Sequence, residues 1–191
     1  MNILKKYVVL MLAALSFGAG ANAVAANLLV NGSFEQPGCS GSCILDTPVK
    51  ANFITGWTTF LSGAEYFNLP ASFGSAAADG VAIVDLANYV YGNGGGIQQN
   101  FATTVGAKYR LTFSAGNSRY ASRSGDGVIQ VKVAGQTATF NTPSAKGVAV
   151  EWSTITYEFT AITPQTTLAF FNEQNPYANF AFIDNVIVEP L

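Results

Sequence analysis

Residues 108–114 read Lys-Tyr-Arg-Leu-Thr-Phe-Ser, and this stretch decides the fold. Tyr109, Leu111 and Phe113 alternate with polar residues, so one side of the segment is apolar and the other is polar. Strict alternation over seven residues predicts a half-buried β-strand, because successive side chains of a strand point to opposite faces. Residues 153–159 repeat the pattern, which predicts a second strand of the same kind.

Further short segments rich in Val, Ile, Thr, Phe and Tyr alternate with turn-forming residues along the chain. We expect strands at Leu28–Val30, Gly56–Phe60, Ala64–Phe67, Val81–Leu86, Ile97–Phe101, Val128–Val133, Thr137–Phe140, Thr167–Phe171 and Phe180–Glu189. Almost nothing after residue 26 has a helical pattern. Many short strands without helical crossovers predict an all-β fold, a two-sheet antiparallel β-sandwich of jelly-roll type.

The first 25 residues are expected to be a signal peptide. Lys5 and Lys6 precede an apolar run of about eleven residues, and small residues before Ala23 and Ala25 suit cleavage after either. The run is shorter than the roughly 20 residues that span a bilayer, which favours export over the alternative of an N-terminal anchor. We therefore expect a secreted, periplasmic or extracellular protein, with residues 26–191 as a single domain and no membrane insertion after signal removal.

The composition excludes several function classes. The chain has no histidine, so a Ser-His-Asp triad, a Cys-His dyad, a histidine-ligated zinc or iron and a histidine pH switch are impossible. Without the two lysines of the signal segment, seven Lys and Arg face eleven Asp and Glu, a net charge of −4. Because nucleic-acid binding needs clustered cations, no nucleic-acid partner is expected. At 49% hydrophobic and 10% charged residues, the chain is also unlike a disordered one.

The two cysteines, Cys39 and Cys43, are separated by three residues. In an exported chain an even pair predicts a disulfide, which here would staple a turn. The alternative is a redox dithiol, which normally has two intervening residues and begins a helix.

An ordered series of short motifs resembles a known family. The series is Asn27–Glu35 (NLLVNGSFE), Gly56-Trp57, Ala64–Phe67 (AEYF), Asp79–Leu86 (DGVAIVDL), Gly96–Gln99 (GIQQ), Gly106–Phe113 (GAKYRLTF) and Phe182–Val186 (FIDNV). It is similar to the galactose-binding-like jelly rolls and, more narrowly, to the choice-of-anchor C proteins and the domain-of-unknown-function 642 group. The resemblance implies an extracellular, non-catalytic, carbohydrate-binding module. The sorting tail of some relatives is missing, which leaves anchoring open. Both tryptophans match framework positions and are expected to pack in the core.

The resemblance also implies a structural calcium ion. The matching ligands are Glu35 of the opening motif and Asp184 of the closing strand, with backbone carbonyls near Asn31 and Ser33. Hard oxygen ligands suit calcium, and such a site would join the first and last strands. The alternative is that Glu35 is an exposed acid at a strand end and that Asp184 caps a turn.

Sugar-binding surfaces combine aromatic rings with side chains that form hydrogen bonds to hydroxyl groups. Loop-like segments of this chain contain both types of residue, and we expect them to line one ligand surface together with two glutamines on a neighbouring strand. The candidates are Tyr89, Tyr91, Gln98, Gln99, Asn117, Arg119, Tyr120, Arg123, Asn172, Gln174, Asn175 and Tyr177. The alternative is that the tyrosines simply cover the rim of the sandwich.

Two other functions remain open. A glycosidase needs only two carboxylates, and Glu65, Asp79, Asp85, Asp126 and Glu173 are the available candidates, although none belongs to a recognisable acid–nucleophile pair. No other catalytic motif is present, so we expect no enzyme. The third possibility is a structural protein of the envelope or extracellular matrix, in contact with other envelope proteins. Specific retention of a glycan would favour the binding module, release of reducing sugar would favour the glycosidase, and neither result would leave the structural role.

Overall fold

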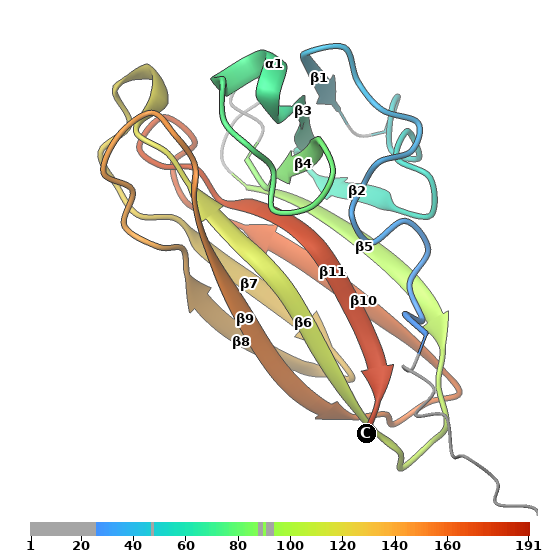
Figure 1. The fold of residues 1–191 in the computed structure, drawn as a ribbon. Helices are drawn as coiled ribbons and strands as arrows, with labels where there is room; N and C mark the ends of the chain where they lie inside the picture. The colour runs from blue at the N-terminus through green and yellow to red at the C-terminus, as the bar shows by residue number, and fades with distance from the viewer. Residues whose placement is uncertain (1–25, 47, 88–89, 91–93) are drawn as a thin grey trace, which may run out of the picture.

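The computed structural model describes residues 26–191 except 47, 88–89 and 91–93, so the expected signal peptide lies outside the described residues. The described part contains two antiparallel sheets packed face to face (Figure 1). Its strands are β1 Ser42–Leu45, β2 Thr58–Leu61, β3 Ala64–Asn68, β4 Ala82–Asp85, β5 Gly95–Ala102, β6 Lys108–Asn117, β7 Val128–Val133, β8 Gln136–Asn141, β9 Glu151–Thr160, β10 Gln165–Asn172 and β11 Phe182–Pro190. One sheet has the order β1-β3-β4-β11-β6-β9 and the other β2-β5-β10-β7-β8.

The expected all-β sandwich is confirmed. One expected strand, Leu28–Val30, does not form, and one strand that was not expected, β1, is present. Leu28–Val30 forms no ladder: the Leu28 N–H donates to the Val188 carbonyl at 2.9 Å, and Val30 bonds to the side chain of Gln99 through both its N–H and its carbonyl. The Gln99 side chain thus makes the hydrogen bonds to Val30 that the backbone of a neighbouring strand would otherwise make. The missed strand is β1, which pairs with β3.

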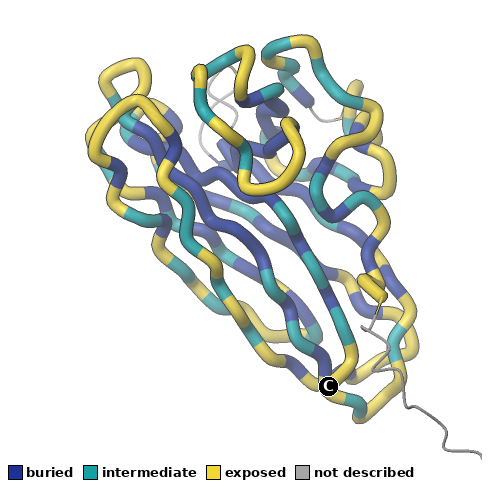
Figure 2. The backbone as a smooth tube through the Cα atoms, in the orientation of Figure 1, coloured by how far each residue is buried: buried dark blue, intermediate teal, exposed yellow. Residues whose placement is uncertain are grey.

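The main core lies between the sheets. Tyr109, Leu111 and Phe113 are all buried there, so the apolar side of residues 108–114 faces the core as predicted. Trp57 is also buried, with its ring 5.2 Å from that of Phe34, and its indole N–H donates to the Asn31 carbonyl at 3.0 Å. Its expected packing role is confirmed. Figure 2 shows buried segments along the strands of both sheets and exposed ones at the connecting loops.

A second, smaller core lies on the outer face of the six-stranded sheet. Its buried members are Phe67, Leu69, Ile83, Val150, Phe180 and Phe182, and Phe73, Ala77 and Trp152 pack against them. Trp152 lies over Gly116, where an added Cβ would be 2.5 Å from the indole ring. The predicted packing role of Trp152 is therefore confirmed in this second core.

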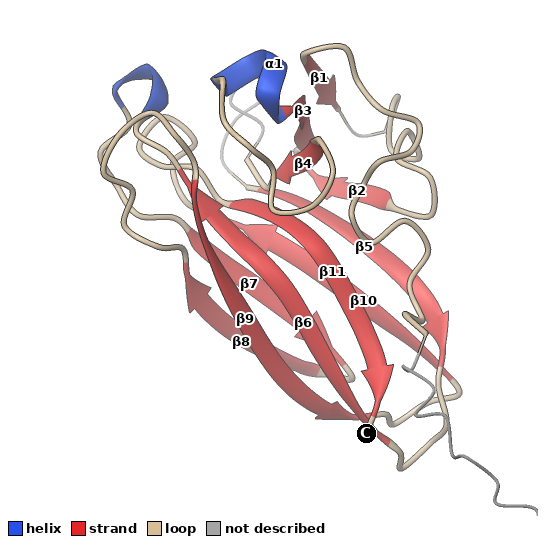
Figure 3. Cartoon of the chain, viewed as in Figure 1, coloured by secondary structure: helices blue, strands red, loops and turns tan. Residues whose placement is uncertain are grey.

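The short helix α1, Leu69–Phe73, covers the second core and was not predicted (Figure 3). Its start is encoded locally: the Asn68 side chain accepts a hydrogen bond from the Ala71 N–H, and Pro70 lies in the first turn. Gly74 ends it with φ 62°, a conformation that favours glycine. A 3₁₀ turn, η1 at Tyr120–Ser122, lies at the same end of the sandwich (Figure 1).

No helix in the described ranges combines the length and the apolar character that a membrane crossing requires.

Candidate functional site

A pocket of about 560 Å³ opens over the second core, at the end of the sandwich that carries α1 and η1. We call it the α1 pocket. Its walls come from β1, β3, α1, η1 and the loop between β10 and β11. The lining residues are Ser42, Glu65, Phe67, Ser72, Phe73, Tyr120, Ala121, Arg123, Tyr177 and Phe180.

Aromatic rings form one wall of the α1 pocket. The Phe73 ring lies 4.7 Å from that of Tyr120 and 5.5 Å from that of Phe180, measured between centroids. Tyr120 is 44% exposed and Tyr177 is 66% exposed, so both present aromatic surface to solvent beside this buried cluster. The wall therefore offers apolar ring surface that a ligand can cover.

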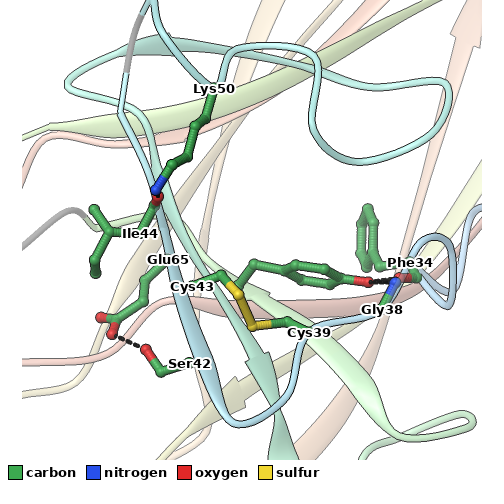
Figure 4. Close-up of a disulfide and its surroundings, with 9 residues drawn as sticks. Phe34, Gly38, Cys39, Ser42, Cys43, Ile44, Lys50 and Glu65 are labelled. Carbon is green, nitrogen blue, oxygen red and sulfur yellow. Dashed lines mark hydrogen bonds between the residues drawn. A yellow bond between two sulfur atoms is a disulfide. The ribbon is translucent and has the colours of Figure 1, made fainter.

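Charged and hydroxyl groups also line the pocket. Strand alternation places Glu65 on the same side of β3 as Phe67, away from the main core that holds Tyr66. The Ser42 hydroxyl donates to Glu65 Oε1 at 2.6 Å (Figure 4). Burial raises the pKa of Glu65, while the Ser42 hydrogen bond and the positive charge of Arg123 lower it.

Asp85 on β4 pairs with Glu65 on β3, so the two side chains lie side by side on the same face of the sheet. Its carboxylate accepts a hydrogen bond from the Ala181 N–H at 3.1 Å. The pKa of Asp85 is raised to about 8, because burial and the negative charge of Glu65 outweigh the backbone N–H groups and the charge of Arg123, which lower it. The pocket therefore has one acid in its lining, Glu65, and a second acid next to it, Asp85, which favours the neutral form near pH 7.

Arg123 is fixed in place by the loop that precedes β11. Its Nε–H donates to the Pro176 carbonyl at 2.9 Å, and its guanidinium carbon lies 3.8 Å above the centre of the Phe180 ring. Stacking on an aromatic face holds the guanidinium in one plane, and the positive charge is attracted by the π-system. Arg123 therefore presents its remaining N–H donors from a rigid position.

The backbone of η1 is strained where it lines the pocket. Ala121 and Ser122 have φ angles of 52° and 61°, in the left-handed region that non-glycine residues rarely adopt. Arg119 holds the loop on its other side: its Nε–H donates to the Ala145 carbonyl, and its Nη groups donate to the Gly125 carbonyl and to Asp126. Strain of this kind persists where the surroundings impose it, and it is common at ligand sites.

The structure brings three of the predicted ligand residues together in the α1 pocket: Tyr120, Arg123 and Tyr177. Four others hold the surrounding loops. Asn117 is buried, and its amide donates to Asp126 and to the Gly125 and Pro143 carbonyls. Arg119 holds the η1 loop through its bonds to Ala145, Gly125 and Asp126. Gln174 accepts from the Val128 N–H, and Asn175 accepts from the Tyr177 N–H.

Asn172 is also buried, and its Oδ1 accepts a hydrogen bond from the Gln174 N–H, so it shapes the loop from within. Tyr89 and Tyr91 lie outside the described residues.

Gln98 and Gln99 point to opposite faces of β5, so they do not share a surface. Gln99 is buried and bonds to Val30, whereas Gln98 lies on the outer face of the five-stranded sheet. There it lines a second hollow of about 370 Å³, together with Lys132 and Thr167. This hollow and the α1 pocket belong to different sheets, so the single ligand surface expected from the sequence is divided.

Sequence reasoning missed the aromatic members Phe73 and Phe180 and did not assign Glu65 to ligand binding. One available signal was the Ala-Glu-Tyr-Phe segment at 64–67, where Glu65 is the single charged residue in an otherwise apolar predicted strand. The other was Asn68 before Leu69-Pro70, a helix start that would have placed Phe73.

Glu35 and Asp184 both contact the segment that leads into β4. Glu35 Oε1 accepts from the N–H groups of Val81 and Ala82 at 2.9 and 2.8 Å, and its carboxylate packs on Gly80, where a Cβ would lie 2.4 Å from it. Asp184 Oδ2 accepts from the Asp79 N–H at 2.9 Å. The pKa of Asp184 is raised to about 7, because burial and the negative charge of Asp79 outweigh the backbone hydrogen bonds that lower it.

The carboxylates of Glu35, Asp79 and Asp184 form an oxygen-rich group of the donor type that a hard cation takes. Ser33 approaches it as well, because its hydroxyl donates to Asp79 Oδ2 at 2.6 Å. The Asn31 carbonyl does not fit: it already accepts from the Trp57 indole and the Phe34 N–H, which occupy both lone pairs. In the described ranges no three acid, cysteine or histidine side chains cluster closely enough to hold an ion, so backbone oxygens would have to complete the coordination.

The predicted disulfide between Cys39 and Cys43 is present, with the Cα atoms 6.2 Å apart (Figure 4). It closes the loop that leads into β1 and so supports Ser42 at the pocket.

The remaining acids named as possible catalysts are dispersed. Asp126 accepts from Ser144 and Arg119, two hydrogen bonds that lower its pKa. Asp79 belongs to the group around Asp184, and Glu173 is not among the residues of the α1 pocket. Glu65 and Asp85, which are neighbours across β3 and β4, are therefore the acids closest to a pair, and of these two only Glu65 lines the pocket.

Comparison with solved structures finds the same fold at low sequence identity. A CBM4 carbohydrate-binding module superposes with a TM-score of 0.50 and 15% identity, covering 85% of this chain and 99% of that one. An arabinose-bound α-L-arabinofuranosidase, MgGH51, gives 0.54 and 14%, covering 87% of this chain and 26% of that one. The enzymatically active domain of tailspike protein 4 of bacteriophage CBA120 gives 0.53 and 12%, covering 86% and 21%. These similarities show that the fold is a jelly-roll sandwich.

No curated protein sequence matches the chain. The sequence profile of a family described as "Protein of unknown function (DUF642)" matches residues 27–189, nearly the whole described part. The resemblance seen in the motif series is thereby confirmed, and the chain belongs to the DUF642 family.

Proposed function

We propose that this protein is an exported, non-catalytic carbohydrate-binding module whose ligand binds in the α1 pocket. The observation that carries the proposal is the combination, in one pocket, of exposed aromatic surface with rigid hydrogen-bonding groups: Tyr120 and Tyr177 beside Glu65 and Arg123. A pyranose has apolar faces that stack on aromatic rings and hydroxyls that need donors and acceptors. The CBM4 likeness supports the same role.

The pocket favours binding over hydrolysis. Glycoside hydrolysis requires two carboxyl groups that flank the scissile bond. Of the described residues that line the α1 pocket, Glu65 alone carries a carboxyl, since Asp85 lies below the surface. Release of reducing sugar from a polysaccharide that the protein retains would contradict a non-catalytic role.

The proposal is tested by affinity electrophoresis and calorimetry on a panel of neutral and acidic polysaccharides. Tyr120→Ala and Tyr177→Ala should each weaken binding about tenfold, which corresponds to about 1.4 kcal/mol and to the usual contribution of an aromatic contact. Tyr157→Ala is the matched control, because Tyr157 lies on β9 and bonds to Gln136, outside the pocket.

Retention of every polysaccharide by both pocket variants at the affinity of the original protein would place the site elsewhere, and the hollow at Gln98 and Lys132 would be the next candidate. If no polysaccharide binds the original protein, a structural role among envelope proteins becomes the better account.

We further propose that Glu35 and Asp184 hold a structural calcium ion, with Asp79 and the backbone near Ser33 as additional oxygen donors. Two features support this. Acids from the opening motif, the β4 entry and the closing strand meet at one segment, and one of them is buried beside a like charge. Bound calcium would supply positive charge to these carboxylates and no chemistry to the α1 pocket.

A further inference from the structure

The two charged residues of the α1 pocket are each held rigidly, and they are not joined to each other. The guanidinium of Arg123 is fixed by the Pro176 carbonyl and the Phe180 ring, and the carboxylate of Glu65 is fixed by the Ser42 hydroxyl. No ion pair within 4.0 Å links them in the described structure, although Arg123 is close enough to influence the titration of Glu65. A donor and an acceptor thus face the same space across a gap.

A sugar hydroxyl fits such a gap, because it donates one hydrogen bond and accepts two. One hydroxyl, or two on adjacent ring carbons, can donate to Glu65 and accept from the N–H groups of Arg123. The charged partners make these hydrogen bonds stronger than neutral ones. Tyr120 and Tyr177 line the same pocket, so their rings can contact the apolar side of the sugar.

The charge balance of the pocket disfavours an acidic sugar. The titratable and charged groups that meet there are Glu65, Asp85, Arg123, Tyr120 and Tyr177. Asp85 favours its neutral form near pH 7, so Arg123 faces Glu65 without a second anion. A ligand carboxylate would gain the attraction of Arg123 but bring a like charge next to Glu65, and like-charge juxtaposition in a partly buried site is costly.

We infer that the α1 pocket selects a neutral sugar unit whose hydroxyls bridge Glu65 and Arg123, and that Glu65 makes it discriminate against uronic acids. This inference rests on the proposed function, since it specifies the ligand of the same pocket. It assigns Glu65 and Arg123 as the residues that determine specificity.

The test compares matched ligands by calorimetry or by saturation-transfer NMR with competition. The probes are the methyl glycosides of glucose, galactose and mannose and of the corresponding glucuronic, galacturonic and mannuronic acids, so that each pair differs only at carbon 6. For the configuration that binds, the original protein should prefer the neutral member at least about tenfold, the equivalent of about 1.4 kcal/mol. Glu65→Gln should reduce that ratio to near one, because the amide keeps the shape and removes the charge. Arg123→Gln should weaken the neutral ligand about tenfold.

The ratio of affinities is insensitive to partial loss of folded protein, and Tyr157→Ala should leave it unchanged. Equal binding of both members, a preference for the uronic acid, or a ratio unaltered by Glu65→Gln would overturn the inference while the sugar-binding function stands. If no probe binds and no polysaccharide is retained, the proposed function fails, and the inference fails with it.

Discussion

Ala121 and Ser122 show how single residues shape the α1 pocket. A left-handed backbone costs a non-glycine residue roughly 1–2 kcal/mol, and two such residues stand in sequence where η1 lines the pocket. Hydrogen bonds from Arg119 and Arg123 to three backbone carbonyls hold the loop in this shape. The strain at Ala121 and Ser122 therefore lowers the stability of the fold, and it fixes the positions of Tyr120 and Arg123 on either side.

Ala121→Gly should relieve the strain at that position. Glycine adopts positive φ without penalty but loses about 0.5–1 kcal/mol of additional chain entropy, so we expect a net stabilisation of about 0.5 kcal/mol. Binding in the α1 pocket should weaken a few-fold, because the loop becomes less rigid. Urea denaturation and calorimetry measure the two effects. Ala134→Gly is the matched control: Ala134 has φ 50° in the turn between β7 and β8, so it should gain stability without losing affinity.

Asp85 gives a prediction on pH. Its folded-state pKa of about 8 lies above the value of about 3.9 in an unfolded chain. Between pH 4 and 8 the unfolded chain has released a proton that the folded protein keeps, so this group makes stability fall as pH rises. Asp85→Asn cannot titrate. The melting temperature of this variant relative to the original protein should therefore rise steadily across that window.

Asp126→Asn is the opposite control, since hydrogen bonds from Ser144 and Arg119 lower the pKa of Asp126. The stabilising effect of Asp126 is present at neutral pH and is lost as pH falls below the unfolded value. A difference between Asp85→Asn and the original protein that stays constant from pH 4 to 8 would show that Asp85 is ionised in the fold.

At the scale of elements, β1 depends on the disulfide. Four residues make a short edge strand, which is held by its pairing with β3, by the burial of Leu45 in the main core and by the link between Cys39 and Cys43. β1 carries Ser42, whose hydroxyl orients Glu65. The disulfide therefore contributes to the pocket as well as to stability.

The Cys39→Ser, Cys43→Ser double variant tests this role. Closing a loop of five residues restricts the unfolded chain by about 2 kcal/mol in the chain-entropy account, so the free energy of unfolding should fall by about that amount in urea titrations. Reductant should lower the stability of the original protein equally and leave the variant unaffected. A double variant as stable as the original would mean that β1 keeps its place without the link.

The strands could be predicted from the sequence where alternation was strict, as in β6, because burial of one face depends on the local pattern. β1 was not predictable in this way, since Ser-Cys-Ile-Leu is only four residues long and has no alternation of apolar and polar side chains. Helix α1 was overlooked for a related reason. Five residues are too few for a periodic pattern, and the helix start is indicated in the sequence by the Asn68 cap and Pro70.

At the scale of the whole molecule, the architecture was predictable and the site was predictable only in part. Tyr120, Arg123 and Tyr177 were recognisable because aromatic and hydrogen-bonding residues in loops have little reason to serve the core. Their partners Glu65 and Phe180 come from segments that read as strands. The pocket exists because a second core covers the outer face of one sheet, and sequence periodicity does not show which outer face is covered.

The two ends of the described chain meet through backbone and side-chain contacts, so an ion bound near them would affect the stability of the whole domain. Asn27 bonds to Val186 and Val188, and Gly32 accepts from the Val186 N–H. Glu35 and Asp184 lie beside these contacts, so an ion there would stabilise the closure of the sandwich.

Chelation should therefore lower the melting temperature of the whole domain. Calcium at a hundred times its dissociation constant stabilises a folded protein by about 2.7 kcal/mol, which for a domain of this size corresponds to roughly 5–10 °C. Calorimetric scans with calcium and with EGTA measure the shift. Asp184→Asn melts lower at the start, because an NH2 group replaces one of the two carboxylate oxygens that accept backbone N–H groups. Its readout is therefore the difference between the two scans, which should vanish. Asp126→Asn should keep the full difference. An unchanged midpoint in the original protein on chelation would mean that the hydrogen bonds of Glu35 and Asp184 suffice to join the strands without an ion.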